Sequence, residues 1–120
     1  MTRINCIPAN ELTDKHLVAE YRELPRLAKH AKQKWERNPG FVPPGSYRMG
    51  KGHMDFFVDK GAWLAMRHRE LTAEMKKRGF TVNYPIYPSD FHPTEWMNDW
   101  APTTEAQEIN RQRIQERLRG

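Results

Sequence analysis

Apolar and polar residues recur with helical periodicity in a long stretch near the start of the chain. On a wheel of about 100° per residue, one face is apolar and the opposite face is basic. The apolar face comprises Leu17, Tyr21, Leu24, Ala28 and Ala31, and the basic face comprises Lys15, Arg22, Arg26 and Lys29. The pattern predicts one helix from about Thr13 to about Trp35, capped at Asn10 or Thr13. Pro25 should kink it, because proline lacks the backbone N–H that a helix uses.

Two further helices are predicted by the same periodicity. The second runs from about Asp59 to Arg78 and buries Leu64, Leu71 and Met75. Gly79 is placed to be its left-handed C-cap, with Phe80 as the accompanying hydrophobic contact. The stretch Thr104-Glu105-Ala106-Gln107 is typical of a capping box and predicts a last helix that buries Ile109, Ile114 and Leu118.

The segments between these helices are rich in turn formers and aromatic residues. Pro43-Pro44-Gly45-Ser46 predicts an extended loop, and Gly50-Lys51-Gly52 predicts a turn. From Thr81 to Pro102 the chain is broken by prolines and carries many aromatic residues. These aromatic residues either stack on nucleic-acid bases or wrap the helices and supply most of the core. We favour the second interpretation. The sequence thus predicts an all-α fold, a compact single domain over residues 1–120 with about three helices, a kinked first helix and long irregular loops.

Charge and composition narrow the functional classes. The chain has 20 Lys and Arg against 15 Asp and Glu, a net charge of +5, which favours a polyanionic partner. Cys6 is the sole cysteine, so an internal disulfide is excluded. No apolar signal segment and no apolar run of membrane-spanning length is present. We therefore expect a cytoplasmic, monomeric protein without a membrane anchor.

The boundary between the two faces of the first helix offers candidate chemistry. His16 and Glu23 are seven residues apart and fall together on that boundary. A carboxylate there would be partly shielded from water and still accessible to a ligand. The basic face beside them is either an ordinary solvated surface or a surface that binds phosphates. His53 follows a glycine turn, but no ligand spacing links it to another histidine, so we interpret it as structural and predict no metal site and no cofactor.

The residues in and around this helix resemble those of a known family. Thr2-Arg3-Ile4-Asn5, Glu11-Leu12, His16-Leu17 and the run from Ala19 to Arg26 are similar to the opening of the phage-type pyrimidine-dimer DNA glycosylases, also called endonuclease V type. The similarity returns at Gly50-Lys51-Gly52-His53, at Phe56-Phe57 with Asp59-Lys60, and at Lys77-Arg78-Gly79-Phe80. It extends over most of the chain.

The resemblance implies a DNA repair glycosylase with AP-lyase activity that acts on double-stranded DNA containing cyclobutane pyrimidine dimers. By this resemblance the α-amine of Thr2 is the nucleophile, and Glu23 stabilises the cationic intermediate and moves protons. Strand cleavage follows by β-elimination, and the enzyme flips a base out of the bent duplex. The residues that would hold the DNA are Arg3, His16, Arg22, Arg26, Arg113 and Arg117.

The amine is chemically suited to this role. An unperturbed α-amino group has a pKa of about 7.7 to 8.0, so a useful fraction is neutral near pH 7. Neighbouring arginines would lower that pKa and Glu23 would raise it. Thr2 is small enough for removal of Met1 to be efficient, and a retained Met1 would hold the Thr2 nitrogen in a peptide bond. Glu20, one turn before Glu23, is expected to tolerate replacement by glutamine.

Some positions depart from the family pattern, and other functions stay open. Lys15 stands where the family has glutamine, the loop from Lys29 to Tyr47 is not similar, and the sequence ends at Gly120 without the family's aromatic and basic tail. These departures bear on lesion specificity more than on chemistry. The alternatives are a basic helical module that binds DNA without catalysis and a relative that acts on a different modified base.

Overall fold

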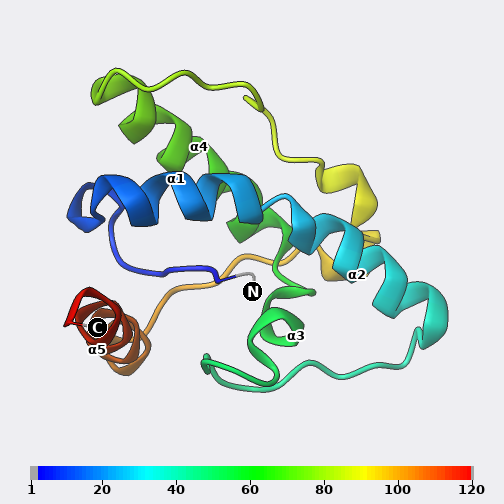
Figure 1. Cartoon of the computed structure of the whole chain (residues 1–120). Helices are drawn as coiled ribbons and strands as arrows, with labels where there is room; N and C mark the ends of the chain where they lie inside the picture. The colour runs from blue at the N-terminus through cyan, green and yellow to red at the C-terminus, as the bar shows by residue number, and fades with distance from the viewer. Residues whose placement is uncertain (1–2, 120) are drawn as a thin grey trace.

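The first helical segment is bent at Pro25, as the sequence predicts. In the computed structural model, which describes residues 3–119, α1 spans Asp14–Glu23 and α2 spans Arg26–Arg37. The two helices follow one another with a change of direction between them (Figure 1). Leu27 N bonds to Leu24 O at 3.0 Å, a three-residue spacing that tightens the turn at the proline. The prediction of a kinked helix is confirmed.

The cap and the two faces of this helical segment also agree with the prediction. Thr13 precedes α1, and its side chain accepts a hydrogen bond from the His16 backbone N–H at 3.2 Å. This contact satisfies one of the free N–H groups at the helix start. All five residues of the predicted apolar face are buried, and all four residues of the predicted basic face are exposed.

Helix α4, Gly61–Lys77, crosses behind α1 and packs against it (Figure 1). Leu64, Leu71 and Met75 are buried, as predicted. The helix ends in a Schellman motif at Gly79, whose φ of 87° is in the left-handed region that glycine adopts readily. Phe80 N bonds to Met75 O at 2.9 Å, which completes the predicted cap.

Helix α5, Thr104–Arg119, begins where the sequence predicts, but its details differ. Thr103 supplies the cap instead of Thr104, since the Thr103 side chain accepts a hydrogen bond from Ala106 N at 3.0 Å. The predicted burial of Ile109 and Leu118 is wrong, because their side chains are 41% and 55% exposed. The buried face is made by residues spaced four apart, namely Ala106, Asn110 and Ile114. Periodicity that counts only apolar residues misses this face, since its central member is an amide.

Short elements complete the fold. They are η1 (Ala9–Glu11), α3 (His53–Phe57), η2 (Ser89–Phe91) and η3 (Thr94–Trp96). The predicted turn before α3 is present: Gly50 and Gly52 adopt φ values of 69° and 87°. Outside the helices, the only ladder-type pairing within residues 3–119 is an isolated bridge between Lys60 and Met97. The fold is therefore all-α and compact, as predicted, and none of the helices described is long and apolar enough to cross a membrane.

The core combines the N-terminal segment with the helices and an aromatic cluster. Phe56 and Phe57 of α3 lie in a cluster with Tyr47, Trp63 and Trp100, in which neighbouring ring centroids are 5.0 to 6.1 Å apart. The aromatic stretch after α4 contributes only part of this core. Its buried members are Tyr87 and Trp96, whereas Tyr84 and Phe91 are exposed. The expectation that this stretch supplies most of the core is therefore wrong.

Candidate functional site

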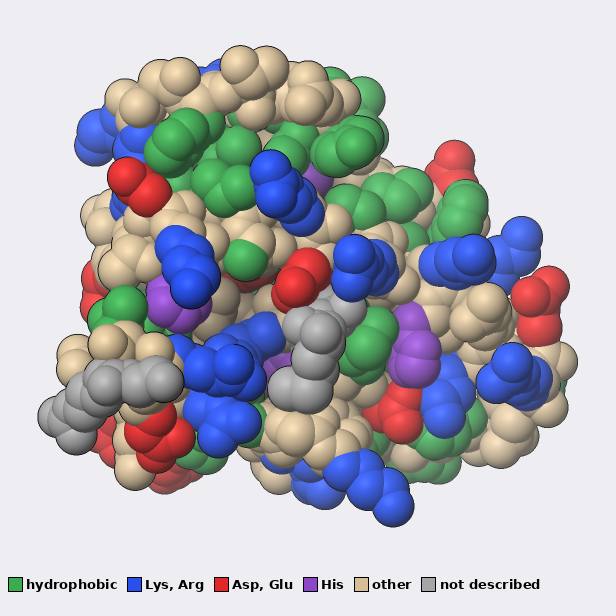
Figure 2. All heavy atoms as spheres, in the orientation of Figure 1, with side chains coloured by type: hydrophobic (Ala, Val, Ile, Leu, Met, Phe, Trp, Pro, Cys, Tyr) green, Lys and Arg blue, Asp and Glu red, His purple; other side chains and the backbone are tan. Residues whose placement is uncertain are grey.

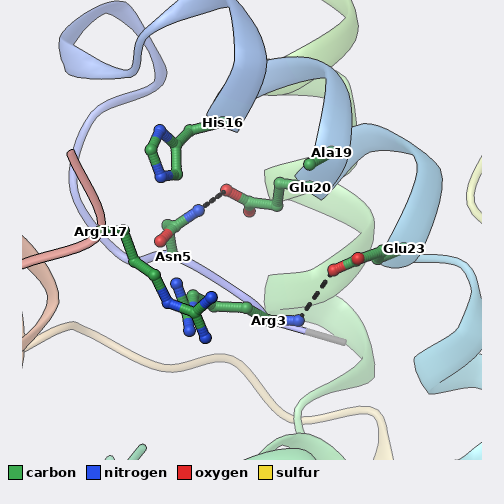
Figure 3. A pocket seen from close by; sticks show the side chains of 7 residues that line it. All are labelled: Arg3, Asn5, His16, Ala19, Glu20, Glu23 and Arg117. Atoms are coloured by element: carbon green, nitrogen blue, oxygen red, sulfur yellow. Dashed lines mark hydrogen bonds between the residues drawn. The ribbon is translucent and has the colours of Figure 1, made fainter. Parts of the chain in front are cut away.

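A cleft of about 200 Å³ lies between the N-terminal segment, α1 and α5. Its lining residues are Arg3, Asn5, His16, Ala19, Glu20, Glu23 and Arg117 (Figure 3). The N-terminal segment passes beneath α1, and the last helix closes one side of the cleft. The fold therefore brings together four of the residues singled out from the sequence, from three separate segments of the chain.

Glu23 contacts the N-terminal segment directly. One of its carboxylate oxygens, Oε2, accepts a hydrogen bond from the Arg3 backbone N–H at 3.0 Å (Figure 3). The Glu23 side chain is partly buried, as the helical wheel predicts. Within residues 3–119, no Lys, Arg or His side chain forms an ion pair with this carboxylate. Its negative charge is thus available to a group that enters the cleft.

Three arginines form a cationic cluster beside the carboxylate. Burial lowers the pKa of Arg3, and the charges of Arg117 and Arg113 on α5 lower it further. Like charges repel, so an anion bound among these side chains would relieve an unfavourable interaction. Lys and Arg side chains gather between α5 and the N-terminal segment on the surface shown in Figure 2. The cluster has the chemistry of a phosphate-binding site.

His16 adds a titratable group to the same cleft. Burial lowers its pKa, and the charges of Arg3, Lys15 and Arg117 lower it further. Its ring Nδ1 lies 2.8 Å from Thr13 Oγ1, which orients the imidazole. Because the ordinary pKa of histidine is about 6.5, the depressed value keeps His16 mostly neutral at pH 7 in the free protein.

The lowered pKa of His16 predicts that any binding of phosphate in this cleft depends on pH. A phosphate in the cleft would favour the charged imidazolium, so binding should raise the pKa of His16 and take up a proton. We expect affinity for an undamaged duplex to increase as pH falls from 7.5 to 5.5, and to increase less in His16→Asn. Titration of the His16 ring by NMR, with and without duplex, measures the shift. An equal pKa in both states would contradict a phosphate contact.

Arg22 and Arg26 lie apart from this cleft. They line a second groove of about 410 Å³, together with Tyr21, Thr81 and Tyr84 among others. Both arginines are exposed, while the Tyr21 hydroxyl is buried and accepts the backbone N–H groups of Asn83 and Tyr84 at 2.7 and 2.6 Å. The predicted DNA-binding residues therefore form two groups: Arg3, His16 and Arg117 line the cleft, with the charge of Arg113 acting on Arg3, and Arg22 and Arg26 line the second groove.

Sequence reasoning missed a buried ion pair under the cleft. Glu20 and Arg67 are 1% and 3% exposed and form two hydrogen bonds, at 2.8 and 3.0 Å. This pairing argues against the expectation that Glu20 tolerates glutamine, because Arg67 would lose its buried counter-charge. A signal was present: Glu20 lies among the apolar positions of the first helix, and Arg67 lies between Leu64 and Leu71 at helical spacing.

His53 is structural, as interpreted from the sequence. It is buried, its Nε2 accepts the Ile4 backbone N–H at 2.8 Å, and its Nδ1 donates to Arg48 O at 2.8 Å. Burial lowers the pKa of this imidazole, which fits a neutral ring that accepts at one nitrogen and donates at the other. Among residues 3–119, no group of three or more His, Cys, Asp or Glu side chains is arranged to hold a metal ion.

Thr2, predicted to be the nucleophile, lies outside the described residues, so the described part of the site begins at Arg3.

Comparison with known proteins gives a family match. A family model described as pyrimidine dimer DNA glycosylase matches residues 1–88. The matched range contains the N-terminal segment and helices α1 to α4, while α5 lies beyond it.

Proposed function

This chain belongs to the pyrimidine dimer DNA glycosylase family, and we propose that it repairs DNA through an imine formed by its Thr2 amine. In this proposal the protein removes a base at a cyclobutane pyrimidine dimer in duplex DNA and then cleaves the strand as an AP lyase. The observation that carries the proposal is the 3.0 Å hydrogen bond from Arg3 N to Glu23. The Arg3 N–H that Glu23 holds belongs to the residue directly after the proposed nucleophile, and one residue spans at most about 3.6 Å of chain.

The chemistry follows from an amine and an adjacent carboxylate. The neutral amine attacks C1′ of the damaged nucleotide, and the C1′–N bond to the base breaks with its electron pair leaving on the base, which then takes a proton. The attached amine loses a proton, its lone pair then forms the C1′=N bond as the C1′–O4′ bond breaks, and O4′ takes up a proton from solvent, which leaves an open-chain cationic imine. The Glu23 carboxylate stabilises that positive charge at short range in a partly dry cleft.

Strand cleavage then needs a base and a leaving phosphate. Removal of a proton from C2′ of the imine pushes electrons toward C3′, and the 3′ C–O bond breaks with the phosphate leaving as an anion. Water hydrolyses the resulting imine and frees the amine. Glu23 is the group we propose to accept the C2′ proton, because it is the cleft carboxylate without an ion-pair partner among residues 3–119.

The basic side chains serve to hold the DNA. Arg3, Arg113 and Arg117 are clustered on the α5 side of Glu23, where a phosphate flanking the damaged nucleotide would neutralise them. His16 contributes a further donor when protonated. We propose that Arg22 and Arg26, exposed in the second groove, contact the backbone farther along the duplex and help to keep it bent while the base is flipped.

Borohydride trapping tests the proposed function. Borohydride reduces an imine to a stable amine, so protein that begins at Thr2 should become covalently attached to ultraviolet-irradiated or abasic duplex. Protein that retains Met1 should be trapped far less, because its free amine is displaced by one residue. Mass spectrometry should place the link on the Thr2 nitrogen.

Lysines provide the internal comparison. Lys60 Nζ already donates to Phe56 O and Asp59 Oδ1 at 2.7 and 2.9 Å, whereas Lys15 is exposed. An adduct on either lysine, or equal trapping with and without Met1, would exclude Thr2 as the nucleophile. A protein that binds DNA without chemistry would form no adduct at all.

A further inference from the structure

The segment from Arg3 to Ile7 is held in place by side chains of other elements. Within residues 3–119 it has no strand partner, and its backbone groups bond to side chains instead. Ile4 N donates to His53 Nε2 at 2.8 Å, and Ile4 O accepts from the Tyr47 hydroxyl at 3.1 Å. Sliding the segment by one residue would break both hydrogen bonds, so these contacts fix its register.

Asn110 of α5 makes the remaining amide contacts of this segment. Its Oδ1 accepts the backbone N–H groups of Cys6 and Ile7, at 2.7 and 3.3 Å. Its Nδ2 donates to Asn5 Oδ1 at 2.6 Å. Asn5 in turn donates to Glu20 on α1 at 2.8 Å (Figure 3). One buried chain of hydrogen bonds thus joins α5, the N-terminal segment and the helix that carries the candidate acid.

Asparagine is an unfavourable choice here on packing grounds alone. The Asn110 side chain is fully buried in the middle of a helix, between Ala106 and Ile114 on the same face. Asparagine has a low helix propensity, and a buried amide is costly unless it is hydrogen bonded. A leucine would suit both the helix and the core better. Both the oxygen and the nitrogen of the Asn110 amide form hydrogen bonds, so this side chain orients the N-terminal segment as well as filling space.

We propose that Asn110 is a positioning residue for the reaction, which sets the register of residues 5–7 and so holds the reacting amine opposite Glu23. The inference rests on the proposed function, since it needs a nucleophile at the N-terminus. It adds to that function a requirement for α5, which lies outside the matched family range. Asn110 would position the amine indirectly, through its hydrogen bonds to Asn5, Cys6 and Ile7.

A purely structural role is the competing explanation, because Asn110 could merely help α5 to pack. The two roles differ in what a substitution changes. If Asn110 only supports packing, activity should decline in proportion to the folded fraction. If it positions the segment, the folded and DNA-bound protein should still form the imine slowly, because a displacement of about 1 Å at the reacting atoms can cost a hundredfold in rate.

The experiment compares Asn110→Ala with Ile114→Ala in full-length protein that begins at Thr2. Ile114 lies on the same buried face one turn later and makes no hydrogen bond to the N-terminal segment. Three quantities are measured below the melting temperature of each variant: affinity for abasic duplex, single-turnover cleavage rate at saturating enzyme, and the rate of borohydride trapping. Asn110→Ser, which retains a small donor and acceptor, is measured in the same way and replaces Asn110→Ala if that variant does not fold.

We expect Asn110→Ala to bind abasic duplex within about twofold of the parent and to be trapped and cleave about 10 to 100 times more slowly. Ile114→Ala should match the parent in trapping rate, and Asn110→Ser should recover part of the loss. Equal trapping rates for Asn110→Ala and Ile114→Ala would overturn the positioning role while leaving the proposed function intact. A parent protein that forms no adduct would overturn the proposed function, and this inference with it.

Discussion

Glu23→Gln is expected to bind damaged duplex as well as the parent protein while its turnover falls by about a hundredfold or more. Glutamine retains the size of the side chain and an oxygen that can accept the Arg3 N–H bond, so the cleft should keep its geometry. The substitution removes only the negative charge that stabilises the cationic imine and the base that accepts the C2′ proton. The measurements are the dissociation constant and the single-turnover rate on irradiated duplex.

Glu36→Gln is the matched control for this experiment. Glu36 is an exposed carboxylate on α2, away from the Glu23 cleft, and the substitution changes the net charge by the same amount. It should leave both the affinity and the rate unchanged. If Glu23→Gln cut irradiated DNA as fast as the parent, the carboxylate would have no catalytic role. If it lost affinity and retained its rate, Glu23 would serve binding only.

Arg67→Met is expected to destabilise the protein by about 3 to 5 kcal/mol, the usual cost of leaving one member of a buried ion pair without its partner. Burial lowers the pKa of Arg67, but the charges and hydrogen bonds of Glu20 and Glu70 outweigh burial and raise it above its ordinary value. The guanidinium also donates to Ile7 O at 2.6 Å. Urea unfolding at pH 7 measures the loss of stability.

A double-mutant cycle with Glu20→Gln shows how much of this loss comes from the pair. The double variant should be less destabilised than the sum of the two single variants, since neither buried charge then lacks its partner. Arg69→Met, an exposed position on the same helix, should change stability by less than about 0.5 kcal/mol. Additive losses in the cycle would mean that Glu20 and Arg67 contribute independently.

The sequence predicted much of the fold because the relevant signals are local. The apolar face of α1 and α2, the kink at Pro25 and the glycine cap of α4 each depend on residues within a few positions of one another. Periodicity and backbone preferences act over that range, so they can be read from a single sequence. The resemblance carried at Thr2-Arg3 and in the run through Glu23 also led to the family, which the match over residues 1–88 then showed.

The candidate site could be predicted only in part. The wheel placed His16 and Glu23 on one boundary, and both line the cleft. The wheel also grouped Arg22 and Arg26 on one face, and the structure places them in a recess of their own. Which neighbours each residue acquires depends on the packing of α5 and of the chain after α4, and helical periodicity contains no information about either.

The tertiary structure alone decided how the N-terminal segment is held. Asn110 contacts residues more than 100 positions earlier in the chain, and Glu20 pairs with an arginine 47 positions later. By itself the sequence determined α1, α2 and α4 with their apolar faces, and the basic character of the chain, because these follow from local preference and composition. The pairing of buried polar groups does not follow from them. A buried amide or charge is stable only beside the partner that the complete fold supplies, so the hydrogen bonds that hold residues 5–7 exist only once α1, α4 and α5 have packed together.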